Sequence, residues 1–422
     1  MRLLRNHGVQ QHGHTEAGDT CGSAQSPATS AITVAVLTGG ADRHYAVGLA
    51  TALIAKGVHL DFIGSDEIDD PQLHAISAVN FLNLRGSQRR DVSFMAKAVR
   101  VCIYYLRLMR YASTARPKVF HILWNNKIQF FDRTLLMAYY KMLGKRITLT
   151  AHNVNAGRRD SKDTLLNRLT LRAQYHLADH IFVHTEKMRR ELCEGFGVSE
   201  IKVAVIPYGI NNAVPDTALT PEEAKQRLGL KMNEKTLLFF GNIAPYKGLE
   251  YLIGAFERIV TAGGDYRLMI AGGPVKDTEK YWDGIQQTIA HSVGRRRIIE
   301  RGEFIPDDET ELYFKAADVL ILPYTYIFQS GVLFLGYSFG LPVIAADVGS
   351  LREDVLEGET GFVCRPKDAG HLAQTIETYF ASELFGKLKS RRQQIREYAR
   401  KRHSWATVAQ ITCNVYAKLL GN

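Results

Sequence analysis

This chain contains no closely spaced cysteine pair of the kind that would indicate an oxidising compartment or a metal site. No Cys-x-x-Cys spacing occurs, and the five cysteines lie far apart, at Cys21, Cys102, Cys193, Cys364 and Cys413. Scattered cysteines in an odd number argue against a disulfide framework and against a zinc site, and they favour a reducing compartment. We therefore expect a cytoplasmic protein and assign these thiols no chemistry.

Long apolar runs are absent as well. Since a spanning helix needs about 18 consecutive apolar residues, the sequence predicts none. The first thirty residues lack the apolar centre of a secretory signal, and their polar composition predicts a disordered tail. His7, His12 and His14 lie in this tail, where solvated side chains are a simpler interpretation than a metal site.

Negative charge is scarce in the first half of the chain. Residues 1–210 contain 27 Lys and Arg against 17 Asp and Glu, whereas residues 211–422 contain 26 of each. The whole net charge of +10 therefore arises in the first half. Such asymmetry predicts a negatively charged partner, such as phospholipid headgroups, a phosphorylated acceptor or nucleic acid.

What the chain does contain is a regular alternation of strand-like and helix-like segments. Residues 32–40 predict a strand that ends in two glycines, residues 45–57 a helix and residues 58–64 a second strand. The alternation continues to Ile210, and a second series runs from residue 236 to residue 346. This pattern is typical of α/β domains with parallel sheets.

The segment after Ile210 is the best domain boundary. It is polar and rich in turn residues, and Thr220, Pro221 and Glu223 then form the signature of a capped helix start. We expect a tail over residues 1–30, a first domain over 31–212, a second over 213–400 and a C-terminal helix over 401–422.

Several motifs together resemble the family 4 glycosyltransferases. They include "TLTAHNV", "VIPYGI", "LLFFGNIAPYKGLEYLIGAF", "LMIAGGP", "SGVLFLGYSFGLPVIAADVG" and "EGETGFVC", in this order. The resemblance implies the GT-B fold of two facing Rossmann-like domains. It also implies transfer of a sugar from a nucleotide sugar with retention at the anomeric carbon. The C-terminal domain would hold the nucleotide, and the N-terminal domain would face the acceptor.

The departing diphosphate of such a donor needs positive charge nearby. We find no convincing Asp-x-Asp pair at a strand end, so we expect no metal and no other cofactor. The resemblance instead places Lys247 of "GNIAPYKG" on the diphosphate, with Gly241 allowing close backbone approach. An Arg commonly follows this glycine in the family, and here that position is Asn242. A surface Lys in a loop is the alternative interpretation.

The second candidate for diphosphate binding is the start of the helix that follows "LILPY". Gln329, Ser330, Gly331 and Val332 stand there, and free backbone N–H groups at a helix start favour an anion. Simple N-capping by Ser330 is the alternative. The family usually has two glutamates around this helix, and our alignment places them at Ile327 and Leu335. Gln329 is the nearest polar substitute.

The resemblance assigns further positions. His152 follows a predicted strand and would lie beside the donor sugar, and Gly39 and Gly40 form the first strand-to-helix turn. A contact with the nucleotide base is implied for three consecutive residues, Glu303, Phe304 and Ile305.

Residues 94–118 predict an unusual basic helix. Lys97, Arg100, Arg107 and Arg110 recur on it at intervals of 3, 7 and 3 among apolar and aromatic residues. This pattern suits a membrane or acceptor surface. A core helix with a solvated basic edge explains it equally well, and no nucleic-acid-binding motif accompanies it.

These features favour a retaining hexosyltransferase that uses a UDP- or GDP-linked donor on the inner face of the membrane. Its acceptor would be a glycan or a lipid-diphosphate-linked saccharide in exopolysaccharide or cell-surface glycan assembly. The missing glutamates leave two alternatives: a homologue that binds a nucleotide or glycan without turnover, and a nucleotide-sugar epimerase. The sugar, the base, the linkage and the oligomeric state have no signature in the sequence.

Overall fold

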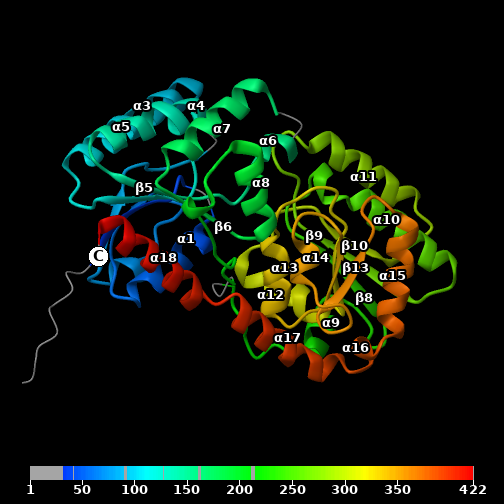
Figure 1. Cartoon of the computed structure of the whole chain (residues 1–422). Coiled ribbons are helices and arrows are strands. Elements are labelled where there is room, and N and C mark those ends of the chain that lie inside the picture. Colours follow the sequence, from blue (N-terminus) through cyan, green and yellow to red (C-terminus); the bar gives the residue numbers. More distant parts are fainter. Residues whose placement is uncertain are drawn as a thin grey trace, which may run out of the picture. The chain divides into compact units, whose positions relative to one another are not determined.

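The computed structural model describes residues 32–40, 42–89, 93–126, 128–159, 163–210 and 214–421. The expected disordered tail and its three histidines lie outside these residues. Residues 32–421 group into one compact unit that contains two parallel sheets (Figure 1). The predicted α/β class is therefore confirmed.

The first sheet has seven strands in the order β3-β2-β1-β4-β5-β6-β7, and every neighbouring pair is parallel. Its inner strands are buried because helices cover both faces, as parallel sheets require. The strands are β1 (Thr33–Leu37), β2 (His59–Gly64), β3 (Val79–Asn83), β4 (Val119–Ile122), β5 (Arg146–Thr150), β6 (His180–Val183) and β7 (Val203–Val205).

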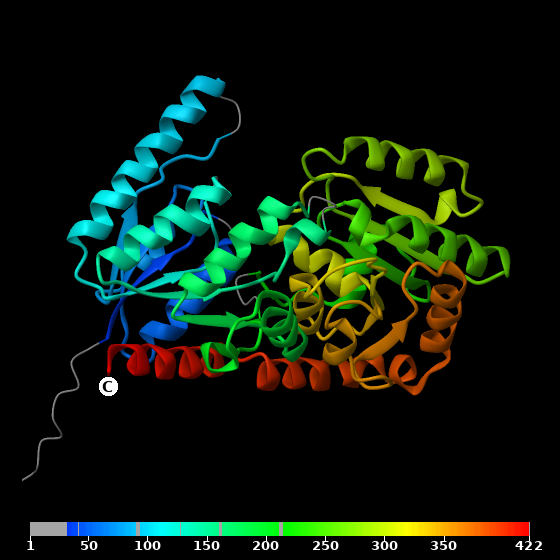
Figure 2. The ribbon, with the colours of Figure 1, turned by 45° about the horizontal axis from the view of Figure 1, so that its top comes forward.

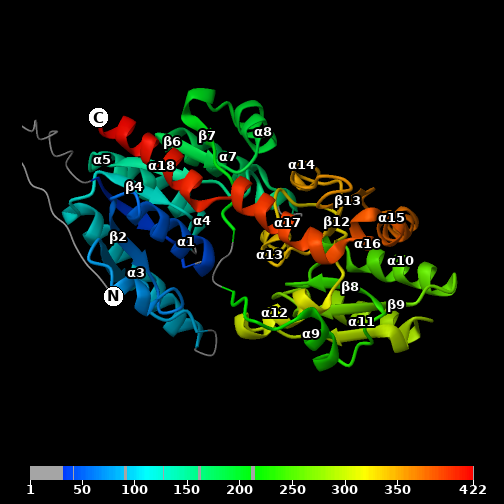
Figure 3. The same ribbon diagram turned by 90° about the horizontal axis from the view of Figure 1, so that it is seen from below.

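The helices of this first domain divide between the two faces of its sheet. Helices α3, α5 and α7 lie on one face, and α1 lies on the other (Figures 1 and 3). The elements are α1 (Arg43–Ile54), α2 (Pro71–His74), α3 (Phe94–Thr114), α4 (Gln129–Phe131), α5 (Met137–Met142), α6 (Ala156–Arg159), α7 (Leu165–Leu177) and α8 (Glu186–Phe196). A π-helical turn, Asp132–Leu136, joins α4 to α5.

The second sheet has six parallel strands in the order β10-β9-β8-β11-β12-β13. The strands are β8 (Lys235–Phe240), β9 (Tyr266–Ala271), β10 (Ile298–Arg301), β11 (Val319–Leu322), β12 (Val343–Ala346) and β13 (Gly361–Cys364). The helices are α9 (Pro221–Arg227), α10 (Leu249–Thr261), α11 (Glu279–His291), α12 (Asp307–Ala316), α13 (Gly331–Ser338), α14 (Leu351–Asp354), α15 (Ala369–Ala381) and α16 (Glu383–Gly386). The capping box predicted for α9 is confirmed: Glu223 N–H donates to Thr220 Oγ1 at 3.2 Å, and Thr220 N–H donates to Glu223 Oε2 at 2.9 Å.

The chain returns to the first domain at its C-terminal end. Helix α17 (Leu388–Arg402) packs against α13, and α18 (Trp405–Leu420) packs against α1. Figure 3 shows α18 in red beside α1 in blue. Tyr416 of α18 is fully buried, and its hydroxyl lies 2.5 Å from Nδ1 of His121 on β4. The last helix is thus part of the core of the first domain.

Two strands carry weaker sequence signals than the others. β3 alternates apolar and polar residues at one edge of its sheet, and β13 has only four residues and begins at a glycine. Neither was predicted, because pairing with a neighbouring strand decides the state of such short segments.

In each sheet, the first three strands in the sequence are added towards one edge, and the later strands are added towards the other edge. In the first sheet β1 lies between β2 and β4, and in the second sheet β8 lies between β9 and β11. Ligands of open parallel sheets bind outside the carboxyl ends of the strands at such points. These ends carry Gly39 and Trp124 in the first domain, and Gly241 and Tyr324 in the second.

Candidate active site

A cavity of about 500 Å³ opens where several predicted donor residues meet. The second domain contributes Gly241, Asn242, Tyr246, Lys247, Ile327, Gln329, Ser330, Gly331, Val332 and Leu335 to its lining. The first domain contributes Asp42, His44, Tyr45, Tyr208 and Gly209, and α18 contributes Trp405. The structure therefore brings together the glycine-lysine motif and the Gln-Ser-Gly motif, which are about 80 residues apart in the sequence.

Gly241 is the point at which these two motifs touch. It follows β8 with φ of +97°, a conformation that favours glycine. A Cβ atom at this position would lie 3.3 Å from the Val332 side chain at the start of α13. A larger residue would therefore both strain the turn and crowd the cavity.

Lys247 is held in place by a tyrosine rather than left in solvent. A 3₁₀ turn, Pro245–Lys247, follows β8, and the Lys247 side chain is 6% exposed. Its Nζ donates a 2.5 Å hydrogen bond to the Tyr324 hydroxyl and lies 4.1 Å from the centre of the Tyr324 ring. The interpretation of Lys247 as an ordinary surface lysine is therefore wrong.

Tyr324 connects Lys247 to the Gln-Ser-Gly motif. Because an ammonium group can only donate, the Tyr324 oxygen accepts from Lys247, and its own proton can be donated to Ser330 Oγ, 3.3 Å away. Burial raises the pKa of Tyr324, which keeps the hydroxyl neutral. Sequence reasoning missed this residue, although its place at the end of "LILPY" was a usable signal.

Ser330 does not act as the cap of α13. Its side chain makes no capping hydrogen bond, and it is almost fully buried beside Tyr324. The N-capping alternative is therefore wrong. The start of α13 instead faces the cavity with its serine turned towards the Lys247–Tyr324 pair.

The two positions expected to be glutamate both lie in the cavity wall. Ile327 and Leu335 line it as apolar side chains. Among the lining residues in the described part of the chain, Asp42 is the one carboxylate. Its Oδ1 caps α1 by accepting from Tyr45 N–H at 3.1 Å, and its Oδ2 lies 3.4 Å from the Tyr208 hydroxyl. A carboxylate therefore reaches this cavity from the opposite domain.

Gln329 lies next to a buried acidic residue, Asp354. Its side chain lies close to the carboxyl group of Asp354, which is 4% exposed. Burial raises the pKa of Asp354 to about 7, against the opposing charge of Arg402 and the Gln329 contact. Gln329 Oε1 and Asp354 Oδ2 are both buried and have no hydrogen-bond partner among the residues that the structure describes.

His152 follows β5 and is enclosed by aromatic rings. It stacks on Trp124 with ring centres 4.3 Å apart and an interplanar angle of 7°, and it meets Tyr45 edge-on at 4.6 Å. Its Nδ1 lies 3.0 Å from Nε2 of His184. Burial, with the neighbouring His184 and His121, lowers the pKa of His152 well below its ordinary value, so the ring is neutral at pH 7.

The protonation state of this histidine pair follows from one backbone contact. His184 Nδ1 lies 3.3 Å from the Ile206 carbonyl, which can only accept, so Nδ1 carries the proton of His184. Burial lowers the pKa of His184 to about 4, so its Nε2 is an acceptor at pH 7. His152 Nδ1 must then donate to it, which leaves His152 Nε2 as an unprotonated acceptor with no partner among the described residues.

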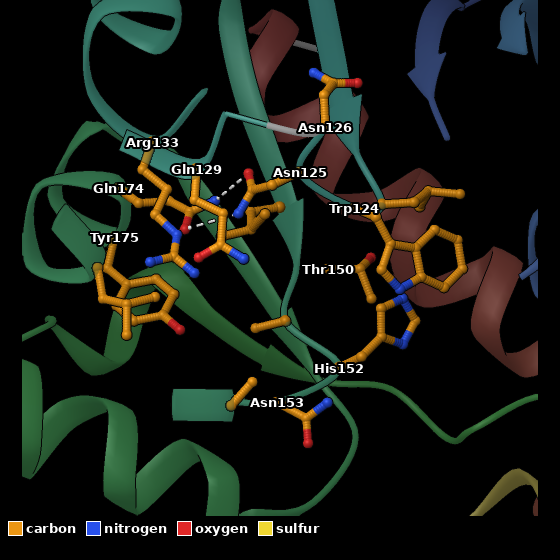
Figure 4. Close-up of a pocket in the computed structure, with 15 residues that line it drawn as sticks. Trp124, Asn125, Asn126, Gln129, Arg133, Thr150, His152, Asn153, Gln174 and Tyr175 are labelled. Atoms are coloured by element: carbon orange, nitrogen blue, oxygen red, sulfur yellow. Dashed lines mark hydrogen bonds between the residues drawn. The ribbon is translucent and has the colours of Figure 1, made fainter. Parts of the chain in front are cut away.

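A smaller pocket of about 240 Å³ lies beside His152 at the ends of β4 and β5. Figure 4 shows Trp124 and His152 on one side of it and Arg133, Gln129, Gln174 and Tyr175 on the other. Asn125 and Gln174 exchange two side-chain hydrogen bonds, of 2.8 and 3.3 Å. The walls thus offer amides, aromatic rings and one buried guanidinium, groups that suit a hydroxylated ligand.

Other predicted residues do not line the cavity that contains Lys247. Gly39 and Gly40 form a left-handed turn, with φ of +60° and +69°, and their carbonyls accept from Arg85 and Gln88. The predicted base-contact residues also lie apart from it: Ile305 is buried, Phe304 is 77% exposed, and Glu303 pairs with Arg301 at 2.7 Å. The base contact stays a prediction.

The basic helix α3 has two apolar faces. Tyr104, Tyr105, Leu108 and Ala112 are buried against the sheet, whereas Met95, Val99, Ile103 and Leu106 are exposed. In the described structure, none of Lys97, Arg100, Arg107 and Arg110 forms an ion pair. Figure 2 shows α3 as the long pale blue helix at upper left. The buried face agrees with a core helix that has a solvated basic edge, and the exposed apolar face leaves the membrane or acceptor surface as a prediction.

Two kinds of feature are absent from the described ranges of the chain. No helix there is long and apolar enough to cross a membrane. No group of three or more His, Cys, Asp or Glu side chains there is arranged to hold a metal ion.

Two family models match the chain, one for each domain. "Glycosyltransferase Family 4" matches residues 38–214, and "Glycosyl transferases group 1" matches residues 234–382. A glycosyltransferase of Methanocaldococcus jannaschii is 29% identical over 55% of this chain and 58% of its own length. A D-inositol 3-phosphate glycosyltransferase of Corynebacterium aurimucosum is 26% identical over 63% of each chain. The chain thus spans about three fifths of the length of these relatives.

Solved structures of similar fold cover nearly the whole chain. Sucrose-phosphate synthase from Thermosynechococcus elongatus has a TM-score of 0.73 at 19% identity, over 93% of this chain and 99% of its own. HepE of Anabaena, solved in complex with UDP-glucose, has a TM-score of 0.67 at 16% identity, over 92% and 99%. The predicted GT-B arrangement of two Rossmann-like domains is confirmed.

Proposed function

We propose that the chain, whose two domains match the family 4 and group 1 glycosyltransferase models, transfers a hexose from a UDP- or GDP-linked donor with retention. The single observation that carries the proposal is the Lys247–Tyr324–Ser330 series in the 500 Å³ cavity at the carboxyl end of β8 in the second sheet. It provides a fixed positive charge and a helix start on one wall, which is what a diphosphate needs. HepE, which shares the fold, was solved with UDP and with UDP-glucose.

The chemistry follows from the charge that the leaving group gains. The acceptor hydroxyl oxygen bonds to the anomeric carbon, and the bond from that carbon to the diphosphate oxygen breaks. The acceptor proton passes to the departing phosphate, which leaves as a nucleoside diphosphate. Lys247 stabilises the charge on this phosphate, so the protein needs no metal ion for the step. Tyr324 fixes Lys247 before the reaction, which limits the cost of reorganisation.

His152 acts in this scheme as a hydrogen-bond acceptor for a sugar hydroxyl. Its neutral ring and unprotonated Nε2 suit that role, and they do not require His152 to be the base. The amide-rich pocket beside it has room for one sugar ring of the acceptor. Asp42 lies across the donor cavity from Ile327 and Leu335, and it supplies a carboxylate in place of the missing glutamates.

Nucleotide binding and transfer are the direct tests. UDP or GDP at 100 times its dissociation constant should stabilise the fold by about 2.7 kcal/mol, a clear rise in melting temperature. Radiolabelled sugar from the matching donor should then enter a membrane lipid extract, with EDTA present throughout. Binding without transfer would favour the non-catalytic alternative suggested by Ile327 and Leu335. Conversion of the donor without acceptor would favour an epimerase.

We also propose that the protein works at the cytoplasmic face of a membrane, in cell-surface or exopolysaccharide glycan assembly. The support is helix α3, whose exposed apolar residues lie opposite its buried face and next to Arg107 and Arg110, which form no ion pair within the described residues. A helix of this kind lies in the headgroup region of anionic lipid, with its apolar side chains shallowly buried.

The membrane proposal predicts a charge-dependent interaction with vesicles. Wild type should sediment with phosphatidylglycerol vesicles and not with purely zwitterionic ones. Replacing Arg107 and Arg110 with Gln should weaken binding about tenfold or more, since each basic residue near an anionic surface contributes about 1 kcal/mol. The matched control is Arg391→Gln with Lys389→Gln on α17, which should bind as wild type does. Equal sedimentation with both vesicle types would contradict the proposal.

A further inference from the structure

A third cavity, of about 870 Å³, lies between residues 85–89 and the first turns of α3. Five cations line it: Arg85, Arg89, Lys97, Arg100 and Lys276. No carboxylate belongs to the lining in the described ranges, and none of the five cations forms an ion pair there. We call this cavity, with these five cations, the basic groove.

Hydrogen bonds hold two of the cations of the basic groove in place. Arg100 donates to the Ser87 carbonyl at 3.0 Å and to the Arg89 carbonyl at 3.5 Å. Arg85 donates to the Gly39 carbonyl and lies 5.5 Å from the centre of the Tyr104 ring. These contacts to neutral groups fix both guanidinium groups, and the nearby Asp132 carboxyl, outside the lining, partly offsets the charge of Arg85. Because like charges held together are costly, the groove gains most from an anion with more than one negative charge.

The remaining walls are apolar. Phe94 is 81% exposed, Ile128 is 47% exposed, and Val101 also lines the groove. A free inorganic anion gains nothing from these surfaces, whereas an amphiphile buries them. The groove therefore matches a ligand that carries an anionic head on an apolar chain. The exposed apolar residues of α3 continue from Met95 to Leu106, so the chain of such a ligand can run on into a bilayer.

The groove also adjoins the glycine turn at Gly39 and Gly40 and the pocket beside His152. Arg85 and Gln88 both donate to the glycine turn at Gly39 and Gly40. The Tyr104 hydroxyl, in the wall of the groove, donates to Asn126 Oδ1 at 2.6 Å, and Asn126 lines the pocket beside His152. Tyr104 thus connects the wall of the groove, where a head group would bind, to the wall of the pocket that suits an acceptor sugar.

We propose that the basic groove binds the diphosphate of a lipid-linked acceptor, whose first sugar enters the pocket beside His152. This inference rests on the transferase function proposed above and names its acceptor class. The two phosphates would contact Lys97, Arg89 and Arg100, and the first isoprenoid-like units would cover Phe94 and Ile128.

The test is calorimetry with farnesyl diphosphate, a short-chain probe, on the full chain without vesicles. Wild type should bind it more tightly than inorganic diphosphate, because only the farnesyl chain buries the apolar wall. Arg89→Gln with Lys97→Gln should weaken binding at least about tenfold, the effect of losing one charge-assisted contact. Lys389→Gln with Arg391→Gln on α17 is the control of equal charge change outside the groove, and its affinity should stay within about twofold.

Each contrary outcome points to a different error. Equal affinity of wild type and the Arg89/Lys97 variant overturns the groove assignment. Equal affinity for inorganic and farnesyl diphosphate overturns the lipid part. UDP and GDP binding is measured on the same samples, and retention of it in the groove variant shows that the variant is folded. Failure of every nucleotide to bind wild type, with the probe still bound, contradicts the transferase proposal and leaves the groove site standing.

Discussion

Replacing Lys247 with Met is expected to lower the kcat of sugar transfer about 10²–10³-fold, with a much smaller change in affinity for the intact nucleotide-sugar donor. Removal of one preorganised donor from a site of developing negative charge has an effect of this size. Met keeps an unbranched apolar stem against the Tyr324 ring, so the packing is largely retained while the charge is lost. The loss should fall on kcat because the leaving phosphate gains charge only in the transition state.

Single-turnover transfer with saturating donor measures this effect. Lys280→Met, at an exposed position on α11, is the matched control and should transfer at the wild-type rate. The melting temperature of both variants shows whether the fold is intact. Equal rates for wild type and the Lys247 variant would show that Lys247 does not act on the leaving phosphate. The diphosphate assignment would then have no basis.

Replacing Asp354 with Asn is expected to make the protein more stable than wild type at alkaline pH. The pKa of Asp354 is raised from 3.8 to about 7 by burial. Below about pH 4 both the folded and the unfolded chains hold the proton. Between about pH 4 and pH 7 the folded chain keeps it and the unfolded chain loses it, so stability falls as pH rises and the full cost is present above pH 7.

The expected difference in unfolding free energy follows from the pH interval between the two measurements. From pH 5 to pH 8 wild type should lose about 3 kcal/mol of unfolding free energy relative to Asp354→Asn, since one pH unit corresponds to 1.36 kcal/mol. Urea unfolding at the two pH values measures this difference, and Glu359→Gln, at an exposed position, should follow wild type. A pH-independent difference between wild type and Asp354→Asn would show that Asp354 titrates normally. Because Gln329 contacts Asp354, nucleotide affinity should change over the same pH range.

Much of the fold was predictable because its signals are local. Apolar runs that end in glycine, as at Gly39 and Gly241, fix strand ends from the sequence, and Thr220 and Glu223 fix a helix start. The edge strand β3 and the short strand β13 were missed, since their formation depends on a partner strand rather than on their own residues. The alternative in which Ser330 caps the helix failed for a similar reason: Tyr324 competes for its hydroxyl.

The donor cavity was predictable in part. Lys247, Gln329, Ser330 and Gly331 sit in short motifs next to strand ends, and they meet because all the strands of a parallel sheet end at one edge. Trp405 carries no such signal, because it reaches the cavity only when α18 packs against α1 from the far end of the chain. Asp42 likewise lines the donor cavity from the other domain.

By itself, the sequence determined two parallel α/β domains, an excess of positive charge in the first of them, and the motifs whose backbone turns are local. Only the tertiary structure decided which side chains share a site. It joined Lys247 to Ser330 through Tyr324, made His152 a neutral acceptor through His184, and gathered Arg85, Arg89, Lys97 and Arg100 around one groove. The physical reason is that backbone conformation follows from neighbouring residues, whereas protonation, charge pairing and shape depend on burial and on partners that are distant in the chain.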